Sequence, residues 1–260
     1  MKPLAELDGA SGLRGLLFDI DDTLTTEGRL TAQAYTALER LKRAGKLLVP
    51  ITGRPAGWCD HIARMWPVDA VVGENGAFYF RMRGGRLEKH YHDPQATRTA
   101  NRARLQTIAQ RILAEVPGCA LASDQDYRET DLAIDFCEDV APLSLETAER
   151  IAQLMRAGGL TAKVSSIHVN GWFGGYDKLG MTRRLFAEAF DCAAGVLRRE
   201  FAFAGDSPND APMFAWFDHS VGVANVKRFA GRLDAEPKYV TAAAAGGGFA
   251  ELAAKLAGAA

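Results

Sequence analysis

The fold of this chain is decided by one short stretch, Leu16-Leu17-Phe18-Asp19-Ile20-Asp21-Asp22-Thr23. It begins as an apolar run without alternating polar residues, which is typical of a strand buried on both faces of a parallel sheet. The chain then turns acidic at once. Because ligands of open α/β sheets bind beyond the carboxyl ends of the strands, Asp19 and Asp21 are predicted to lie at a binding crevice.

Later segments repeat this arrangement of an apolar strand that ends in polar residues. A helix predicted over 31–44 is followed by a strand over 46–51, which ends at Thr52-Gly53-Arg54. A strand over 69–72 leads into Glu74-Asn75-Gly76-Ala77, and a strand over 201–204 leads into Gly205-Asp206-Ser207-Pro208-Asn209-Asp210. Lys178 opens the helix before the last of these strands. The alternation of strands and helices predicts right-handed βαβ units, so the polar strand ends should converge on one crevice.

Between residues 83 and 172 the pattern changes. Helices are predicted over 101–116 and 144–158, and strands over 130–136 and 164–169. This order is typical of a small α+β domain. We therefore predict an α/β core domain with a parallel sheet, formed by residues 1–82 and 173–260, with an α+β domain inserted at residues 83–172.

The composition excludes several classes of protein. The 260 residues hold 31 Lys and Arg against 32 Asp and Glu, which argues against a generically basic nucleic-acid-binding protein. Residues 1–15 lack the apolar segment of a secretory signal, and no apolar run reaches the length of about 18 residues that a membrane span needs, so we expect a cytoplasmic protein. The four cysteines are far apart and are predicted to be small core residues, not zinc ligands or disulfides.

Four carboxylates are predicted to converge at the strand ends: Asp19, Asp21, Asp206 and Asp210. Carboxylates held close together repel one another unless a proton or a cation joins them, and an all-oxygen donor set favours Mg2+ where phosphate also binds. One carboxylate could attack phosphorus, and a second acid two residues later could protonate the leaving oxygen and then deprotonate water. Thr52 could donate a hydrogen bond to a phosphoryl oxygen, and Lys178 could balance the developing charge. These residue types fit phosphoryl transfer through an aspartyl intermediate.

This constellation resembles the phosphatases of the haloacid dehalogenase superfamily. Asp19-Ile20-Asp21-Asp22-Thr23 is similar to the D-x-D-x-T motif of that family, and Thr52-Gly53-Arg54 to its second motif. Lys178 resembles the third motif, and Gly205-Asp206-x-x-Asn209-Asp210 the fourth. The insertion lies where the family places its C2-type cap, and its α+β pattern resembles the cap of subclass IIB sugar-phosphate phosphatases. One departure is that Leu179 separates the lysine from the glycine that often follows it directly in the family.

The resemblance implies a role for each motif residue. Asp19 is implied as the nucleophile and Asp21 as the general acid and base, with Thr52 and Lys178 as further catalytic residues. Mg2+ would be held by the Asp19 side chain, the Asp21 backbone carbonyl and Asp206, supported by Asp210 and Asn209. The residues expected to contact the substrate are Thr52, Gly53, Arg54, Asn75, His168, Asn170, Lys178 and Asn209.

We therefore expect a Mg2+-dependent phosphatase that hydrolyses a small phosphorylated metabolite, with a sugar phosphate favoured, and that is a monomer or a small homo-oligomer. A phosphomutase and a phosphoglycolate-type phosphatase are alternative enzymes. Two alternatives are not enzymes: a receiver-type phospho-acceptor module, and a metabolite-binding protein that has kept the fold. The inserted domain and the intact motif residues favour the phosphatase.

Overall fold

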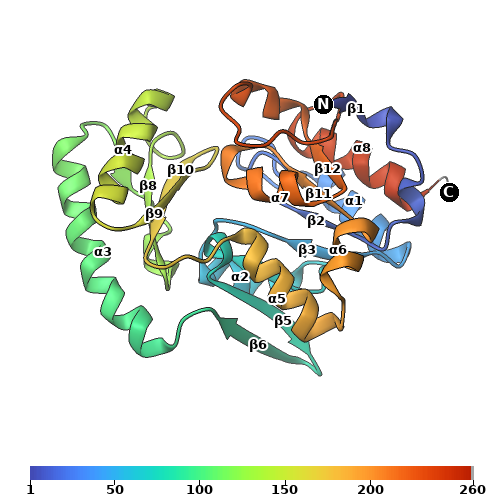
Figure 1. The fold of residues 1–260 in the computed structure, drawn as a ribbon, viewed down its shortest axis with the longest axis horizontal. Coiled ribbons are helices and arrows are strands. Elements are labelled where there is room, and N and C mark those ends of the chain that lie inside the picture. Colours follow the sequence, from blue (N-terminus) through green and yellow to red (C-terminus); the bar gives the residue numbers. More distant parts are fainter. Residues whose placement is uncertain (259–260) are drawn as a thin grey trace.

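The computed structural model describes residues 1–258, and Figure 1 shows them as a core domain beside a smaller insert. The core domain is built on a parallel sheet of six strands in the order β1-β13-β12-β11-β2-β3. The acidic stretch follows β2, which lies between β11 and β3. The strands are β1 (Lys2–Pro3), β2 (Gly15–Phe18), β3 (Leu47–Pro50), β11 (Phe201–Gly205), β12 (His219–Gly222) and β13 (Tyr239–Val240).

Helices cover both faces of this sheet. Successive side chains of a strand point to opposite faces, so the apolar side chains of β2 need a cover on each face. Leu16 and Phe18 pack with α1 (Ala32–Arg43) and α8 (Ala245–Ala257). Leu17 packs on the other face, where α5 (Lys178–Phe190), α6 (Ala194–Glu200) and α7 (Ala211–Trp216) lie. All three side chains are fully buried, which confirms the prediction of a strand covered on both faces.

A second, antiparallel sheet extends the core domain. It consists of β4 (Val71–Gly73), β5 (Phe78–Arg83) and β6 (Arg86–Tyr91), and α2 (Ala56–Met65) packs against it. Because β6 pairs along all of β5, the predicted domain boundary at residue 83 falls inside this hairpin, and the insert begins beyond β6. The sequence pattern does not predict helix α2. Only four of its side chains are buried, and they form too short an apolar stripe to indicate a helix.

The insert, residues 92–172, has an antiparallel sheet in the order β7-β8-β10-β9 with α3 (Gln95–Glu115) and α4 (Leu145–Ala157) packed on one face. The predicted strand over 164–169 is wrong, because it spans the end of one strand, a turn and the start of the next. Ser165 closes this turn: its hydroxyl accepts a hydrogen bond from the His168 N–H at 3.0 Å and donates one to the His168 carbonyl at 2.9 Å. The strands are β7 (Ala120–Leu121), β8 (Asp131–Asp135), β9 (Thr161–Val164) and β10 (His168–Trp172).

The two faces of the insert's sheet differ in polarity. Leu132, Ile134 and Val169 point into an apolar core beneath α3 and α4. Their neighbours along each strand point the other way, toward the core domain. We call this side the polar face, and it carries Asp131, Asp135, Thr161, Lys163, His168, Asn170 and Trp172. The polar face covers the carboxyl ends of the central strands of the core domain.

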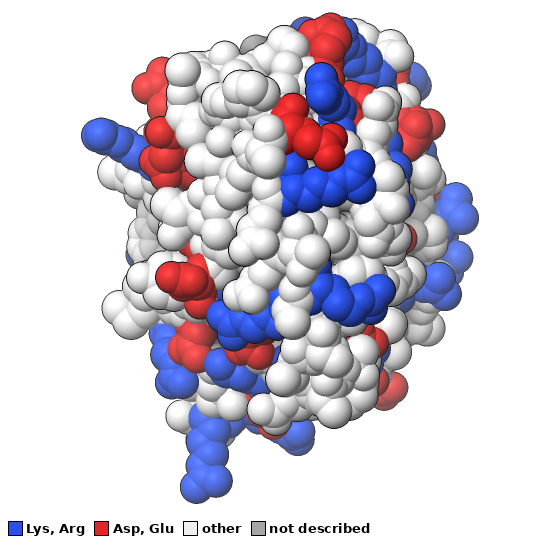
Figure 2. Space-filling view, turned by 90° about the vertical axis from the view of Figure 1, so that its left-hand side faces the viewer, with Lys and Arg blue, Asp and Glu red and all other residues white. Residues whose placement is uncertain are grey.

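The structure also bears on the cysteines and on membrane insertion. All four cysteines are free thiols, two of them buried and two partly buried. Within residues 1–258 no helix combines the length and the apolar character that crossing a membrane requires. On the side of the insert seen in Figure 2, positive and negative side chains are interspersed, in keeping with the nearly balanced composition.

Candidate active site

The central strands bring the acidic stretch and the later motifs together. β2 pairs with β3 on one side and with β11 on the other, so Asp19, Thr52 and Asp206 follow neighbouring strands. All three are buried. Asp177 caps α5 by accepting a hydrogen bond from the Gly180 N–H at 2.6 Å, so the additional Leu179 leaves the start of this helix regular. Lys178, the first residue of α5, reaches the same sheet edge.

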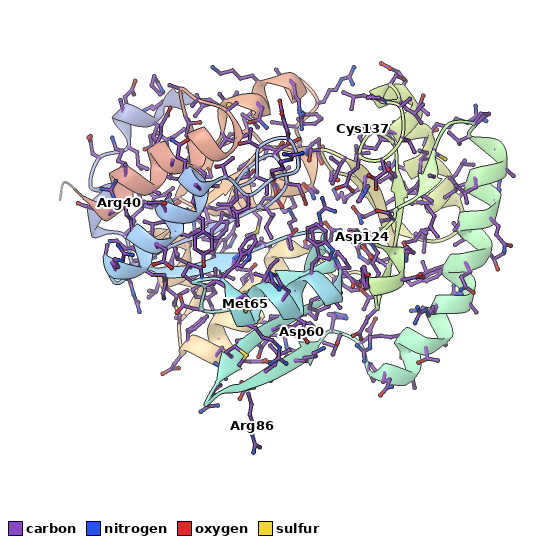
Figure 3. All side chains as sticks on the ribbon, turned by 180° about the vertical axis from the view of Figure 1, so that it is seen from behind. Arg40, Asp60, Met65, Arg86, Asp124 and Cys137 are labelled. Atoms are coloured by element: carbon purple, nitrogen blue, oxygen red, sulfur yellow. The ribbon has the colours of Figure 1, made fainter. Side chains whose placement is uncertain are left out.

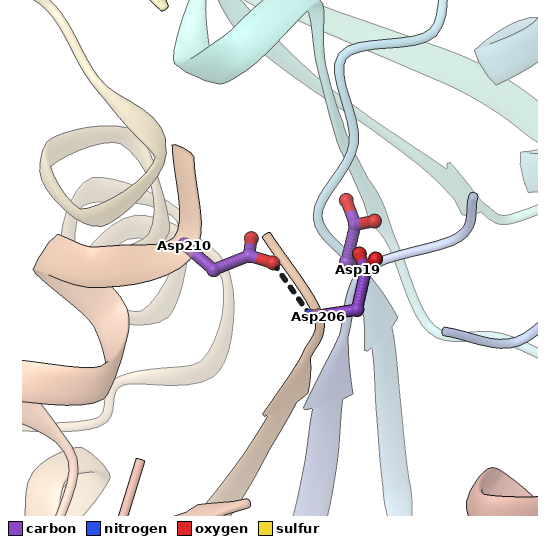
Figure 4. Close-up of side chains that lie close together, drawn as sticks. All are labelled: Asp19, Asp206 and Asp210. Carbon is purple, nitrogen blue, oxygen red and sulfur yellow. Dashed lines mark hydrogen bonds between the residues drawn. The ribbon is translucent and has the colours of Figure 1, made fainter. Parts of the chain in front are cut away.

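Three carboxylates form a cluster there, shown in Figure 4. Oxygen atoms of Asp19, Asp206 and Asp210 all lie within 4.8 Å of one another. Lys178 Nζ lies 2.7 Å from Oδ1 of both Asp19 and Asp210. Asp210 Oδ2 accepts hydrogen bonds from the backbone N–H groups of Asp206 at 3.0 Å and Ser207 at 3.3 Å. Both carboxylate oxygens of Asp210 therefore accept hydrogen bonds from the protein, whereas Asp19 Oδ2 has no hydrogen-bond partner among residues 1–258.

The charges of this cluster are not balanced by protein groups alone. The pKa of Asp19 is raised to about 8, mainly by burial. Lys178 acts to lower this pKa, whereas the nearby carboxylates of Asp210 and Asp21 raise it further. Burial, with the charges of Asp19 and Asp210, also raises the pKa of Asp206 well above its usual range. Burial disfavours the charged ammonium of Lys178, yet the two aspartates raise its pKa. Buried, oxygen-only donors with surplus negative charge fit a hard divalent cation such as Mg2+.

Asp206 has further partners that the sequence did not indicate. Its Oδ2 accepts hydrogen bonds from Asn225 Nδ2 and from Arg228 Nη2, both at 3.1 Å. The same Arg228 nitrogen lies 3.1 Å from Oδ2 of Asp22. Arg228 is half exposed and comes from a 3-10 turn late in the chain, Ala224–Phe229, so no spacing in the sequence could have linked it to the cluster.

The carboxylate of Asp21 lies apart from the three clustered carboxylates. It accepts hydrogen bonds from Arg54 Nε at 3.0 Å and Arg54 Nη2 at 2.8 Å. Arg54 is buried, its backbone N–H donates to Thr52 Oγ1 at 3.0 Å, and Trp58 covers the guanidinium at 4.3 Å. The Asp21 side chain thus faces the insert and does not join the other three predicted metal ligands. Asp21 could contribute its backbone carbonyl to the metal instead.

Arg54 also joins the core domain to the insert. Its guanidinium lies 3.3 Å from Asp124 and 2.5 Å from Glu138, two insert residues that the sequence analysis missed. Figure 3 shows Asp124 on the insert at its border with the core domain. His168 Nε2 lies 2.8 Å from Glu138, although not in hydrogen-bond geometry. Burial opposes ionisation of Glu138, but His168 and Arg54 together lower its pKa to about 2.

A second buried arginine strengthens this border. Arg128 forms ion pairs with Asp124 at 3.0 Å and Asp131 at 2.9 Å, and it donates a hydrogen bond to the Gly53 carbonyl at 2.9 Å. Asn170 Nδ2 donates to Asp131 at 3.1 Å. The predicted substrate residues His168 and Asn170 thus lie on the polar face, opposite the strand ends.

Asn75 presents an unused donor to the site. Its backbone has a φ of +55°, and its side chain is buried with the Nδ2 group unpaired within residues 1–258. Its Oδ1 accepts a hydrogen bond from Asn209 Nδ2 at 3.4 Å. Both asparagines line a cavity of about 170 Å³ together with Lys178 and, from the insert, Thr161 and Lys163. The last two residues are not among those predicted to contact the substrate.

A parallel sheet with acidic residues at its central strand ends, covered by an inserted α+β domain, matches the haloacid dehalogenase fold with a cap domain. The family model described as haloacid dehalogenase-like hydrolase matches residues 16–110. This match confirms the resemblance drawn from the four motifs, of which the matched segment holds the first two. No curated protein sequence matches this chain.

Solved structures extend the likeness of the fold over most of the chain. Protein 0175 of Thermoplasma acidophilum has a TM-score of 0.68 at 17% identity, covering 92% of this chain and 96% of that one. The sucrose-phosphatase of Synechocystis sp. PCC6803, solved with sucrose and phosphate, has a TM-score of 0.59 at 16% identity, covering 92% and 96%. A subclass IIB sugar phosphatase named BT4131 has a TM-score of 0.57 at 16% identity, covering 88% and 93%.

Proposed function

We propose that this chain is a Mg2+-dependent phosphatase that hydrolyses a small phosphorylated metabolite through an aspartyl-phosphate on Asp19, with sugar phosphates as the favoured class. One observation carries the proposal: Asp19 Oδ2 has no hydrogen-bond partner in the described part of the chain, while Lys178 fixes Asp19 Oδ1 and two further buried carboxylates lie beside it. The match to a hydrolase family and the fold shared with sugar phosphatases support it.

In the first step Asp19 Oδ2 attacks phosphorus, and the bond to the leaving oxygen breaks. Lys178 holds Asp19 in place and offsets the negative charge that develops on the phosphoryl oxygens. The Thr52 hydroxyl and the free Nδ2 of Asn75 are donors at the same strand ends for those oxygens. Asp21 gives a proton to the leaving oxygen.

In the second step a water molecule attacks the phosphorus of the aspartyl-phosphate. Asp21, now deprotonated, takes the proton of that water, and inorganic phosphate leaves while Asp19 is restored. In the structure Arg54 holds the Asp21 carboxylate, so proton transfer requires Arg54 to turn toward its other partners, Asp124 and Glu138.

The residues that would hold Mg2+ are Asp19, Asp206 and the backbone carbonyl of Asp21, with Asp210 behind them. When bound, the ion would lower the proton affinity of the carboxylates and neutralise phosphoryl oxygens. The surplus of buried negative charge described above is the reason to expect it.

The insert would exclude water and contact the leaving group. The insert already meets the core domain through the ion pair of Arg54 with Glu138 and the hydrogen bond from Arg128 to the Gly53 carbonyl, and this contact limits access of bulk water to the strand ends. His168 and Asn170 on the polar face, with Gly53 and Asn209 opposite, are the proposed contacts for hydroxyl groups of the substrate.

Hydrolysis of p-nitrophenyl phosphate with and without Mg2+ tests the proposal. We expect Mg2+-dependent turnover in the wild type and a loss of at least about 1000-fold in kcat for Asp19→Asn, because the amide is a poor nucleophile. Asp218→Asn, which alters only surface ion pairs, should keep normal activity. Full activity of Asp19→Asn, or unchanged activity after chelation of all metal, would contradict the proposal.

Two further measurements separate the proposed reaction from its alternatives. Acid quenching with a 32P-labelled substrate should yield a phosphoprotein labelled at Asp19, and Asp19→Asn should carry no label. Product analysis with a hexose 1-phosphate should find free sugar and inorganic phosphate. Formation of hexose 6-phosphate would indicate a phosphomutase instead.

A further inference from the structure

One cation beside the proposed catalytic residues lacks an acidic partner. Lys163 of β9 is half-buried, and it forms no ion pair or side-chain hydrogen bond with any of residues 1–258. The other cations at this border differ in this respect, since Lys178, Arg54 and Arg128 are each bound by two or more carboxylates. The charge of Lys163 is therefore available to a ligand.

The strand register places Lys163 over the strand ends. Lys163 pairs with Asn170 of β10, and directly opposed residues point to the same face of a sheet. The Asn170 side chain lies against Gly53, which fixes that face as the one turned to the core domain. Lys163 accordingly lines the cavity of about 170 Å³ that also includes Lys178 and Asn209.

Acidic residues on the outer side do not neutralise this lysine. Lys163 also borders a groove of about 580 Å³ between the insert and the core domain. Glu149 and Glu146 line that groove, but Glu149 lies 2.6 Å from Arg156, and Glu146 lies 3.6 Å from Arg232. Asp234 also lines the groove, and Asp177 lines the smaller cavity, where its side chain accepts the hydrogen bond of the Gly180 N–H. None of these four carboxylates forms an ion pair with Lys163.

A second observation points to a ligand in the same cavity. Asn75 is 3% exposed, and its Nδ2 is a buried donor without a hydrogen-bond partner among the described residues. A buried donor costs free energy unless a ligand or water accepts its hydrogen bond. The cavity thus combines an unpaired amide near Lys178 with an unpaired ammonium on the opposite wall.

We propose that Lys163 binds a second anionic group of the substrate, a carboxylate or another phosphate, while the phosphoryl group to be cleaved lies against Asp19. The inference rests on the proposed phosphatase activity and narrows its substrates to phosphomonoesters that carry another negative charge a few atoms from the phosphate. The small cavity suits a short carbon chain between the two groups.

Two matched pairs of substrates test this proposal. Glycerol 3-phosphate and 3-phosphoglycerate differ by a carboxylate, and glycerol 3-phosphate and glycerol 1,3-bisphosphate differ by a phosphate. In the wild type, kcat/KM should be at least about tenfold higher for the more anionic member of one pair, as expected for a charge-assisted hydrogen bond. The pair that shows the preference identifies the anionic group.

The variants separate the charge of Lys163 from its role in structure. Lys163→Gln should abolish the preference while changing kcat/KM for p-nitrophenyl phosphate less than about twofold, and Lys163→Arg should retain it. Lys89→Gln is the matched control, because Lys89 lies on β6 and pairs with Asp60. Equal rates within both pairs in the wild type, or an equal fall for both members in Lys163→Gln, would overturn the inference. Failure to hydrolyse any phosphomonoester, p-nitrophenyl phosphate included, would instead refute the proposed function.

Discussion

Replacement of Gly76 by alanine should displace Lys178 from its partners. Gly76 has a φ of +105° and lies directly against the start of α5. A β-carbon on this residue would lie 2.0 Å from the Asp177 carbonyl oxygen and 2.9 Å from the Lys178 nitrogen. Carbon and oxygen atoms that are not bonded come no closer than about 3.3 Å, so the start of α5 would have to move by about 1 Å.

This movement should affect both activity and stability. Lys178 Nζ holds Asp19 and Asp210 at 2.7 Å, and a misplacement of about 1 Å in a catalytic group reduces kcat by about 100-fold. The unfavourable φ adds about 1–3 kcal/mol to the cost in stability. The unfavourable φ and the steric clash together should lower the free energy of unfolding by about 2–4 kcal/mol. This loss corresponds to a drop in Tm of roughly 5–15 °C for a chain of this size.

The assay compares Gly76→Ala with Gly84→Ala. Gly84 also has a positive φ, +56°, but a β-carbon there would meet no atom within 4 Å. Gly84→Ala should therefore lose only about 1 kcal/mol of stability and keep its kcat for p-nitrophenyl phosphate. Activity is measured at a temperature where both variants are folded. A kcat within twofold of the wild type for Gly76→Ala, or the same loss of kcat in both variants, would refute the reasoning.

Three other substitutions have defined outcomes. Glu74 accepts hydrogen bonds from four donors in the core domain and the insert, so Glu74→Ala should lower the free energy of unfolding by about 3–5 kcal/mol in urea denaturation; a loss below about 1 kcal/mol would contradict this. Arg228→Gln removes a positive charge beside Asp206 and should tighten Mg2+ binding about 2–5-fold in calorimetric titration, whereas Arg232→Gln should leave it unchanged. Burial opposes the ionisation of Glu138, but contacts with His168 and Arg54 lower its pKa to about 2. The contribution of Glu138 to the free energy of unfolding, about 1–2 kcal/mol, is therefore present above pH 4.5 and is lost as the pH falls toward 2. The stabilities of the wild type and Glu138→Gln should then differ at pH 7 and converge below pH 4.5, and a difference that does not change with pH would argue against this linkage.

The positions of the motif residues could be predicted because local sequence determines them. A strand formed by Leu16, Leu17 and Phe18 has apolar side chains on both of its faces, so both faces must be covered. Asp19 therefore had to follow a buried parallel strand. Parallel strands joined by right-handed connections have their carboxyl ends at one edge. The meeting of Asp19 with Asp206 follows from these two facts.

The border between the core domain and the insert could not be predicted in this way. The hairpin of β5 and β6 was divided by the predicted boundary at residue 83, because strand pattern alone does not tell which sheet a hairpin joins. The split between β9 and β10 was missed because the Ser165 turn is short and lacks glycine or proline.

The sequence by itself determined the sheet, the order of the motifs and the residues at the strand ends, since each depends on neighbours in the chain. Only the tertiary structure decided how the charges pair. Arg54 binds Asp21, Asp124 and Glu138 from three separate segments, Arg228 approaches Asp206, and Lys163 has no ion-pair partner within residues 1–258. Ion pairing depends on distances of a few ångströms between segments far apart in sequence, and packing of the insert against the core domain sets those distances.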